Sequence, residues 1–264
     1  MKVILSRKGF DSNHGGQPSP ILPDGTLLSF PIPSKEDNIK YTELFYKGIS
    51  YFELITQLKN KTNIKLKYTC HLDPDIRKDN LKRSPNWKPL FGQQGGALSH
   101  LFSQGVSVGD MFLFFGWFRQ TELIDGTLKY IKNAPDLNVI FGYLQIGNIY
   151  NDNSLLPKEY LYHPHSNQKK YKKNNCIFES SETLEFIPGY PGAGALKFNK
   201  KLVLTKEGFT RSKWQLPDFF KNIEISHHNK SSWINGYFKS CSIGQEFVFD
   251  ANDQILDWVK NVIK

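Results

Sequence analysis

Two short segments of this chain carry side chains that could bind a metal ion or transfer a proton. The first is HLDPDIR, in which His71, Asp73 and Asp75 stand at alternate positions. Alternate residues of an extended chain point to one face, so these side chains could bind a divalent ion or do acid–base work. His71 and Asp73 are the favoured acid–base pair, whereas Asp75 is more simply a helix cap. Asp11, from the N-terminal loop, is a third candidate catalytic residue.

The second segment is His163-Pro164-His165. Two imidazoles held apart by a rigid proline could be metal ligands or donors to a phosphate. Together with His71 and Asp73 they would complete a metal site, but nothing in the sequence brings the two segments together. A pair of exposed loop histidines is the alternative, so the metal and any other cofactor stay unknown at this point.

The loop expected over residues 7–34 could hold a phosphate. It is rich in Gly, Pro and Ser, and loops of this length in compact domains are often functional. Arg7 and Lys8 directly follow an expected strand, and the glycines after them let backbone N–H groups turn towards an anion. The loop lacks the GK[ST] ending of a Walker A motif, and a surface turn is the alternative. Its candidates for contacting a sugar or base edge are Asp11, Ser12 and Gln17.

An aromatic strand expected over residues 111–118 could stack on a base. It ends in Trp117 and Phe118, and Arg119 follows. Trp117 and Arg119 share one face of a strand, where a π surface and a guanidinium could hold a base and a phosphate. Core packing is the alternative for Trp117. The remaining ligand-binding candidates are Gln93 and Gln94, beside an expected helix start, and Arg211 and Trp214 in TRSKWQLP.

Because each of these polar groups stands beside a strand end or a turn, we expect several of them to project into a shared cleft. The residues expected to converge there are Arg7, Asp11, His71, Gln93 and Arg119.

The charge balance favours a polyanionic partner. The chain has 34 basic and 25 acidic residues, a formal net charge of +9, and a basic run, KKYKK, at residues 169–173. A nucleotide or nucleic acid would suit this charge, although a run of lysines can also be a solvated loop. The three cysteines form no CxxC pair, and no apolar run approaches the roughly 20 residues that span a bilayer. We therefore expect a cytoplasmic, reduced protein with no membrane contact.

The apolar pattern predicts a single α+β domain over residues 1–264. Its sheet is expected to be mixed and strongly bent or barrel-like, with peripheral helices. Strands are expected at residues 2–6, 65–72, 111–118, 138–149, 176–178, 201–204 and 245–249. Helices are expected at residues 51–59, 94–104, 218–223 and 252–263.

Taken in order, several segments resemble one family over nearly the whole chain. They include ILSRKGFDSNHGGQPSPILPDGTLLSFPIPS, CHLDPDIR, LFGQQGGALSHLFSQGVSVGDMFLFFGWFR, VIFGYLQIG, HPH and LVLTKEGFTRSKWQLP. The chain resembles the third of the nucleotide modification associated domain families, found in bacteria and phages. That resemblance implies a role near nucleotide or DNA modification and phage–host conflict, without a defined reaction. The two central strands also look like the PUA and EVE barrels, which bind modified bases.

Three functional hypotheses follow. The first, slightly favoured because so many titratable groups stand beside turns, is an enzyme or processing factor that binds and modifies a nucleotide or a DNA base. The second is a non-catalytic binder that reads modified DNA or sequesters a nucleotide. The third is a metal-dependent phosphoesterase that uses His71, Asp73, His163 and His165.

Overall fold

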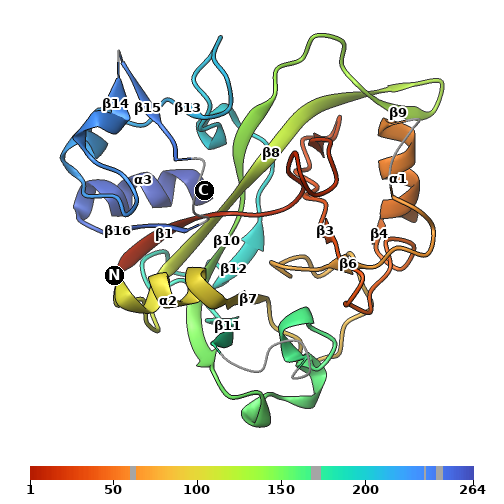
Figure 1. Cartoon of the computed structure of the whole chain (residues 1–264), viewed down its shortest axis with the longest axis horizontal. Coiled ribbons are helices and arrows are strands. Elements are labelled where there is room, and N and C mark those ends of the chain that lie inside the picture. The colour runs from red at the N-terminus through yellow and green to blue at the C-terminus, as the bar shows by residue number, and fades with distance from the viewer. Residues whose placement is uncertain (60–63, 168–173, 235, 242–245) are drawn as a thin grey trace.

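Two long antiparallel strands form the centre of the molecule (Figure 1). The computed structural model describes residues 1–59, 64–167, 174–234, 236–241 and 246–264. The two strands are β8 (Met111–Ile124) and β10 (Leu137–Tyr150), and β1 (Lys2–Arg7) lies parallel to β8. Parallel and antiparallel neighbours in one sheet confirm the predicted mixed α+β class.

The described residues contain one nine-stranded sheet, in the order β16-β1-β8-β10-β11-β7, with three further strands paired beside β8 and β10. The outer strands are β16 (Glu246–Asp250), β11 (Asn175–Ser180) and β7 (Leu90–Gln94), and the flanking ones are β2 (Ser19–Ile21), β9 (Thr127–Tyr130) and β12 (Ala193–Ala195). No pairing joins β16 to β7 among these residues, so the sheet does not close into a barrel.

Three smaller sheets lie outside it. Their strands are β13 (Lys213–Trp214), β14 (Trp233–Ile234) and β15 (Tyr237–Lys239); β3 (Ile32–Pro33) and β6 (Cys70–His71); and β4 (Phe45–Tyr46) and β5 (Ile49–Ser50). In Figure 1 the C-terminal elements and the β3–β6 region lie on opposite sides of β8.

The α-helices are α1 (Tyr51–Leu58), α2 (Gly95–Ser103) and α3 (Asp253–Ile263). A capping box of Ser50 and Glu53 begins α1, and the Asn252 side chain accepts from the Ile255 amide to begin α3. Short 3₁₀ turns occur at Asn153–Leu155, Lys158–Tyr160, Pro164–Ser166, Lys200–Leu202, Asp218–Asn222 and Lys230–Ser232.

Three predicted elements differ from the structure. The strand over 65–72 is reduced to Cys70–His71, because its partner β3 offers only two residues and the second is Pro33. The strand over 201–204 is a 3₁₀ turn followed by an isolated bridge from Val203, and the helix over 218–223 is also 3₁₀.

Aromatic side chains fill the space against the central strands. Phe114 is fully buried, and its ring lies 5.2 Å from Phe91, 5.9 Å from Phe112 and 6.3 Å from Phe141. A second apolar cluster, which includes Phe10, Phe30, Tyr41 and Tyr51, packs under the N-terminal loop. The loop is therefore anchored at Phe10, directly after the residues expected to bind phosphate.

Burial differs between the two ends of β8, which leads to a stability prediction. Phe114→Ala should lower the free energy of unfolding by about 3–5 kcal/mol, because it leaves a cavity among buried rings. Leu123→Ala, on the same strand but 63% exposed, should change it by less than about 0.5 kcal/mol. Urea denaturation of the two variants measures both effects, and equal losses would contradict the packing described here.

Candidate functional site

A cavity of about 710 Å³ lies where the ends of β1 and β7 approach the segments around residues 71–73 and 210–212. It is lined by these residues that the sequence predicted for the site: Arg7, Lys8, Asp11, Ser12, His71, Asp73, Gln93, Gln94, Trp117, His165 and Arg211. Four members of the predicted convergence, Arg7, Asp11, His71 and Gln93, therefore share one cavity, whereas Arg119 is not in its lining.

Arg7 and Arg211 are basic residues of the cavity lining, and the part of the lining that they form is called the basic wall below. Arg7 Nη2 donates to the Cys241 carbonyl at 2.8 Å, and the Arg7 guanidinium lies over the rings of Phe115 and Phe247. Burial lowers the pKa of Arg7, and the nearby charge of Arg211 acts in the same direction. The guanidinium groups of Arg7 and Arg211 are thus close together in a partly desolvated part of the cavity lining.

Lys8, the neighbouring cation, is largely neutralised. Its Nζ lies 3.0 Å from Glu246 Oε1, which also accepts from Gln93 Nε2 at 2.5 Å. This ion pair is almost buried, with side-chain exposures of 9% for Lys8 and 1% for Glu246. Lys8 and Gln93 therefore line the cavity while their polar ends point to a shared internal carboxylate.

Asp11 organises the loop after β1. Its Oδ1 accepts from the amides of Asn13 at 2.7 Å and His14 at 2.6 Å, and its carboxylate also contacts the His14 ring. Asp11 reaches the cavity, but these contacts give it a turn-forming role in the structure.

The two predicted tryptophans are placed differently. Trp117 is partly exposed and lines the cavity, with the Arg211 guanidinium 4.0 Å from its ring centre. Trp214 is 1% exposed, packs edge-on against Phe115, and donates from Nε1 to the Arg211 carbonyl at 2.9 Å. Trp214 is therefore a core residue that holds the backbone of Arg211.

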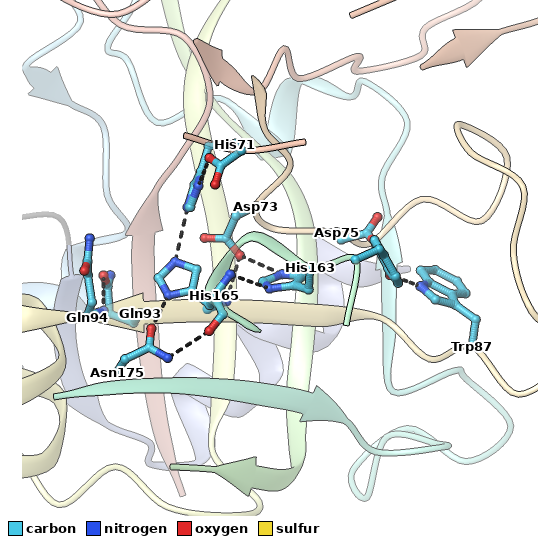
Figure 2. A network of polar contacts seen from close by, with 12 residues as sticks. His71, Asp73, Asp75, Trp87, Gln93, Gln94, His163, His165 and Asn175 are labelled. Atoms are coloured by element: carbon cyan, nitrogen blue, oxygen red, sulfur yellow. Dashed lines mark hydrogen bonds and ion pairs between the residues drawn. The ribbon is translucent and has the colours of Figure 1, made fainter. Parts of the chain in front are cut away.

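Elsewhere in the cavity lining, the side chains of His71, Asp73 and His165 point towards one another (Figure 2). One ligand atom from each lies within 4.8 Å of the other two, and the Nε2 atoms of His71 and His165 are 3.1 Å apart. His71 ends β6, Asp73 follows it in a turn, and His165 comes from the 3₁₀ turn at Pro164–Ser166. We call these three residues the His–Asp cluster.

Burial and charge set the protonation of the His–Asp cluster. Burial alone would raise the pKa of Asp73, but the contact with His163 and the charges of the neighbouring imidazoles lower it to about 2. Burial lowers the pKa of His165 to about 3, with Asp73 opposing this effect. At neutral pH the Asp73 carboxyl is ionised and the His165 ring is neutral.

Gly92 of β7 connects the His–Asp cluster to the large sheet. Its amide donates to Asp73 Oδ1 at 2.7 Å. A Cβ at this position would run into the imidazole of His165. Glycine is therefore required for the close approach of β7 to His165.

Other predicted site residues lie away from the cavity lining. Gln17 is buried and donates to the Ile55 carbonyl at 3.4 Å. Arg119 pairs with Asp136 at 2.7 Å and lies over Tyr130, although its charge still reaches Arg211 and lowers the pKa of that residue. His163 is buried behind the His–Asp cluster, with its Nε2 3.5 Å from Asp73 Oδ1.

Asp75 does not share the face of His71 and Asp73, because the chain turns after β6. It pairs with Arg83 and accepts from the Tyr162 hydroxyl at 2.6 Å. The basic run at residues 169–173 lies outside the described residues.

Sequence reasoning missed the residues that hold the two histidines of the His–Asp cluster. Asp37 contacts His71 Nδ1 at 2.8 Å, and Asn175 contacts His165 Nδ1 at 2.6 Å. Of the residues that support the cluster, only Gly92 could have been singled out from the sequence. It lies in the FGQQGG segment, and a glycine within a strand indicates a close approach of another part of the chain to the backbone.

Comparison with protein families identifies the chain. The family model "Nucleotide modification associated domain 3" matches residues 2–250 of the 264. The chain therefore belongs to this family, which confirms the predicted resemblance. Comparisons with curated proteins and with solved structures give no match. Within the described residues, no helix has both the length and the apolar character needed to cross a bilayer.

The contrast between the tryptophans can be tested. Trp214→Ala should lower the free energy of unfolding by about 3–5 kcal/mol, because it removes a fully buried ring. Trp117→Ala should cost clearly less, because that ring borders the cavity. Chemical denaturation of both variants makes the comparison, and equal losses would place Trp117 in the core instead.

Proposed function

We propose that this protein binds a nucleotide in the cavity, either free or within DNA, and takes part in its modification. The observation that carries the proposal is the composition of the cavity lining. It holds the guanidinium groups of Arg7 and Arg211, the latter beside the Trp117 ring, and it also holds the His–Asp cluster.

The basic wall suits a phosphate. The pKa of both Arg7 and Arg211 is lowered first by burial, and Arg7 is lowered further by Arg211. An anion between the two groups would offset this repulsion and replace lost hydration with charge-assisted hydrogen bonds. A volume of about 710 Å³ lies within the range of small-molecule and cofactor sites.

The remaining lining suits a base and a sugar. Trp117 offers a π surface next to the cation of Arg211, an arrangement that commonly stacks on bases. The same cavity is lined by uncharged polar residues that could contact base edges or sugar hydroxyls; they include Asn138, Thr210, Ser212 and Ser240.

His71 and Asp73 would supply acid–base chemistry on such a ligand. Both line the cavity, and a carboxylate beside imidazoles is suited to moving a proton at a bound base or sugar. A non-catalytic binder would need only the basic wall and Trp117. A setting in phage–host conflict is a further proposal that rests on the family resemblance alone.

We also propose that residues 1–264 act as one unit. Helix α3 lies beyond the family match at residue 250, yet Ile255 and Val259 are buried in the same apolar cluster as the central strands.

Nucleotide binding is tested by titrating deoxynucleoside monophosphates and a short single-stranded DNA against the protein. Arg7→Met and Arg211→Met should each weaken binding about 10- to 100-fold, the effect of losing a charged hydrogen bond worth about 1.5–3 kcal/mol. Affinity for DNA should fall steeply with added salt, whereas affinity for a monophosphate should fall less.

Lys221→Met is the matched control, because it removes one positive charge from the Asp218–Asn222 turn, outside the cavity lining. It should bind like the wild type. The proposal fails if no nucleotide or DNA binds at low salt. It also fails if Lys221→Met weakens binding as much as Arg7→Met, since binding would then follow net charge alone.

A further experiment separates an enzyme from a binder. The protein is incubated with nucleotides and with family-relevant modified or unmodified DNA, and the products are analysed by mass spectrometry. A mass change that disappears in Asp73→Asn, while nucleotide affinity is retained, would support catalysis. Binding with no mass change would support the binder instead.

A further inference from the structure

We propose that the His–Asp cluster is a binding site for one divalent transition-metal ion, held by His71, Asp73 and His165 with its remaining coordination positions open to the cavity. The inference goes beyond the proposed function, because the ion needs only these three side chains and would bind without a nucleotide. A bound ion would take the place of direct acid–base action by His71 and Asp73, since their lone pairs would be engaged as ligands.

The contact with Asn175 places the ring proton of a neutral His165 on Nδ1. The Asn175 side chain donates from Nδ2 to the His165 carbonyl at 2.9 Å, which fixes the orientation of the amide. Its Oδ1 therefore faces His165 Nδ1 at 2.6 Å and accepts the ring proton. A neutral imidazole with its proton on Nδ1 presents an unprotonated Nε2.

The same logic applies to His71. Its Nδ1 lies 2.8 Å from the carboxylate of Asp37, whose side chain is only 3% exposed. A carboxylate accepts, so Nδ1 carries a proton and the Nε2 of a neutral His71 is also a lone pair. The two Nε2 atoms face each other at 3.1 Å and would repel unless a cation, either a proton or a metal, lies between them.

The spacing of the two nitrogens fits a metal. With metal–nitrogen bonds of about 2.1 Å, nitrogens 3.1 Å apart make an angle of about 95° at the ion, close to that of neighbouring ligands in an octahedral sphere. Two imidazoles and one carboxylate on one side of an ion are a known donor set for first-row divalent metals.

Asp73 is held ready as the third ligand. Its Oδ1 accepts from the Gly92 amide at 2.7 Å and faces His163 Nε2 at 3.5 Å. His163 Nδ1 accepts from the His165 amide at 3.3 Å, so the proton of its ring lies on Nε2, towards Asp73. Each of the three ligands thus has an outer partner that orients it, which is the usual arrangement around protein-bound metals.

The open positions give the ion access to a ligand. His71, Asp73 and His165 line the same cavity as Arg7 and Arg211. An ion held there could polarise an oxygen of a bound nucleotide or lower the pKa of a coordinated water. Mg²⁺ prefers oxygen ligands, so the two imidazoles favour a transition metal over Mg²⁺.

The experiment titrates metal alone into tag-free, metal-stripped protein. Co²⁺ is followed by its visible absorption, and Zn²⁺, Mn²⁺ and Mg²⁺ by calorimetry. We expect one Co²⁺ or Zn²⁺ per chain, and much weaker binding of Mg²⁺. His71→Ala, Asp73→Ala and His165→Ala should each weaken Co²⁺ binding at least 100-fold.

The control is His227→Ala, which removes one ring of a different histidine pair, His100 and His227, whose ring centres are 4.1 Å apart. It should bind Co²⁺ like the wild type. If a ligand variant fails to fold, Asn175→Ala replaces it and should weaken binding about 10- to 100-fold, since it removes only the outer partner of His165.

Absence of stoichiometric Co²⁺ or Zn²⁺ binding would overturn the proposal, and a proton would then be the cation shared by the two imidazoles. Binding that is lost in His227→Ala and retained in His165→Ala would overturn it as well. Because no nucleotide is present in the titration, failure of the metal site is distinguishable from failure of nucleotide binding.

Discussion

The hydrogen bond from the Gly92 amide to Asp73 attaches the His–Asp cluster of the cavity to strand β7 of the large sheet. A buried carboxylate is stable only when hydrogen bonds or nearby positive charges compensate for its lost hydration. For Asp73 this compensation comes from the Gly92 amide of the main sheet and from the nearby imidazoles. The absence of a side chain at Gly92 then lets His165 pack directly on the strand. One backbone position thus joins the segments that carry Asp73 and His165 to the sheet.

The cavity lining combines two electrostatic characters. Burial and the nearby charge of Arg211 lower the pKa of Arg7, whereas the imidazoles around Asp73 hold the pKa of its carboxyl low despite its burial. An anionic ligand would be drawn to the arginines, within the same cavity as the His–Asp cluster. One cavity therefore contains cations that could bind an anion and side chains that could move a proton.

Local sequence patterns predicted the parts of the molecule whose structure depends on residues that are close in sequence. Side-chain periodicity predicted the helix α3, and continuous apolar runs predicted the buried parts of β8 and β10. The start of the N-terminal loop follows from its position after β1. The strand expected over 65–72 failed because its length depends on a distant partner, β3. Residue types in HLDPDIR and HPH indicated a cluster, but not that the two segments meet.

The outer residues of the cluster could not be predicted for the same reason. Asp37 and Asn175 lie 34 and 10 positions from the histidines they hold, with no motif that joins them. Trp117 lines the cavity, whereas Asp136 draws the Arg119 side chain into an ion pair outside the cavity lining. Several side chains compete to contact each of these residues, and only the folded chain shows which contact forms.

The most direct test of this account is a crystal structure of the protein with Co²⁺ and a deoxynucleoside monophosphate, with anomalous diffraction data. The account predicts an anomalous peak among His71, Asp73 and His165, and a phosphate in contact with Arg7 or Arg211 of the same cavity. A nucleotide bound elsewhere on the surface, with no ion at the cluster, would contradict the claim that the arginines and the His–Asp cluster act on one ligand.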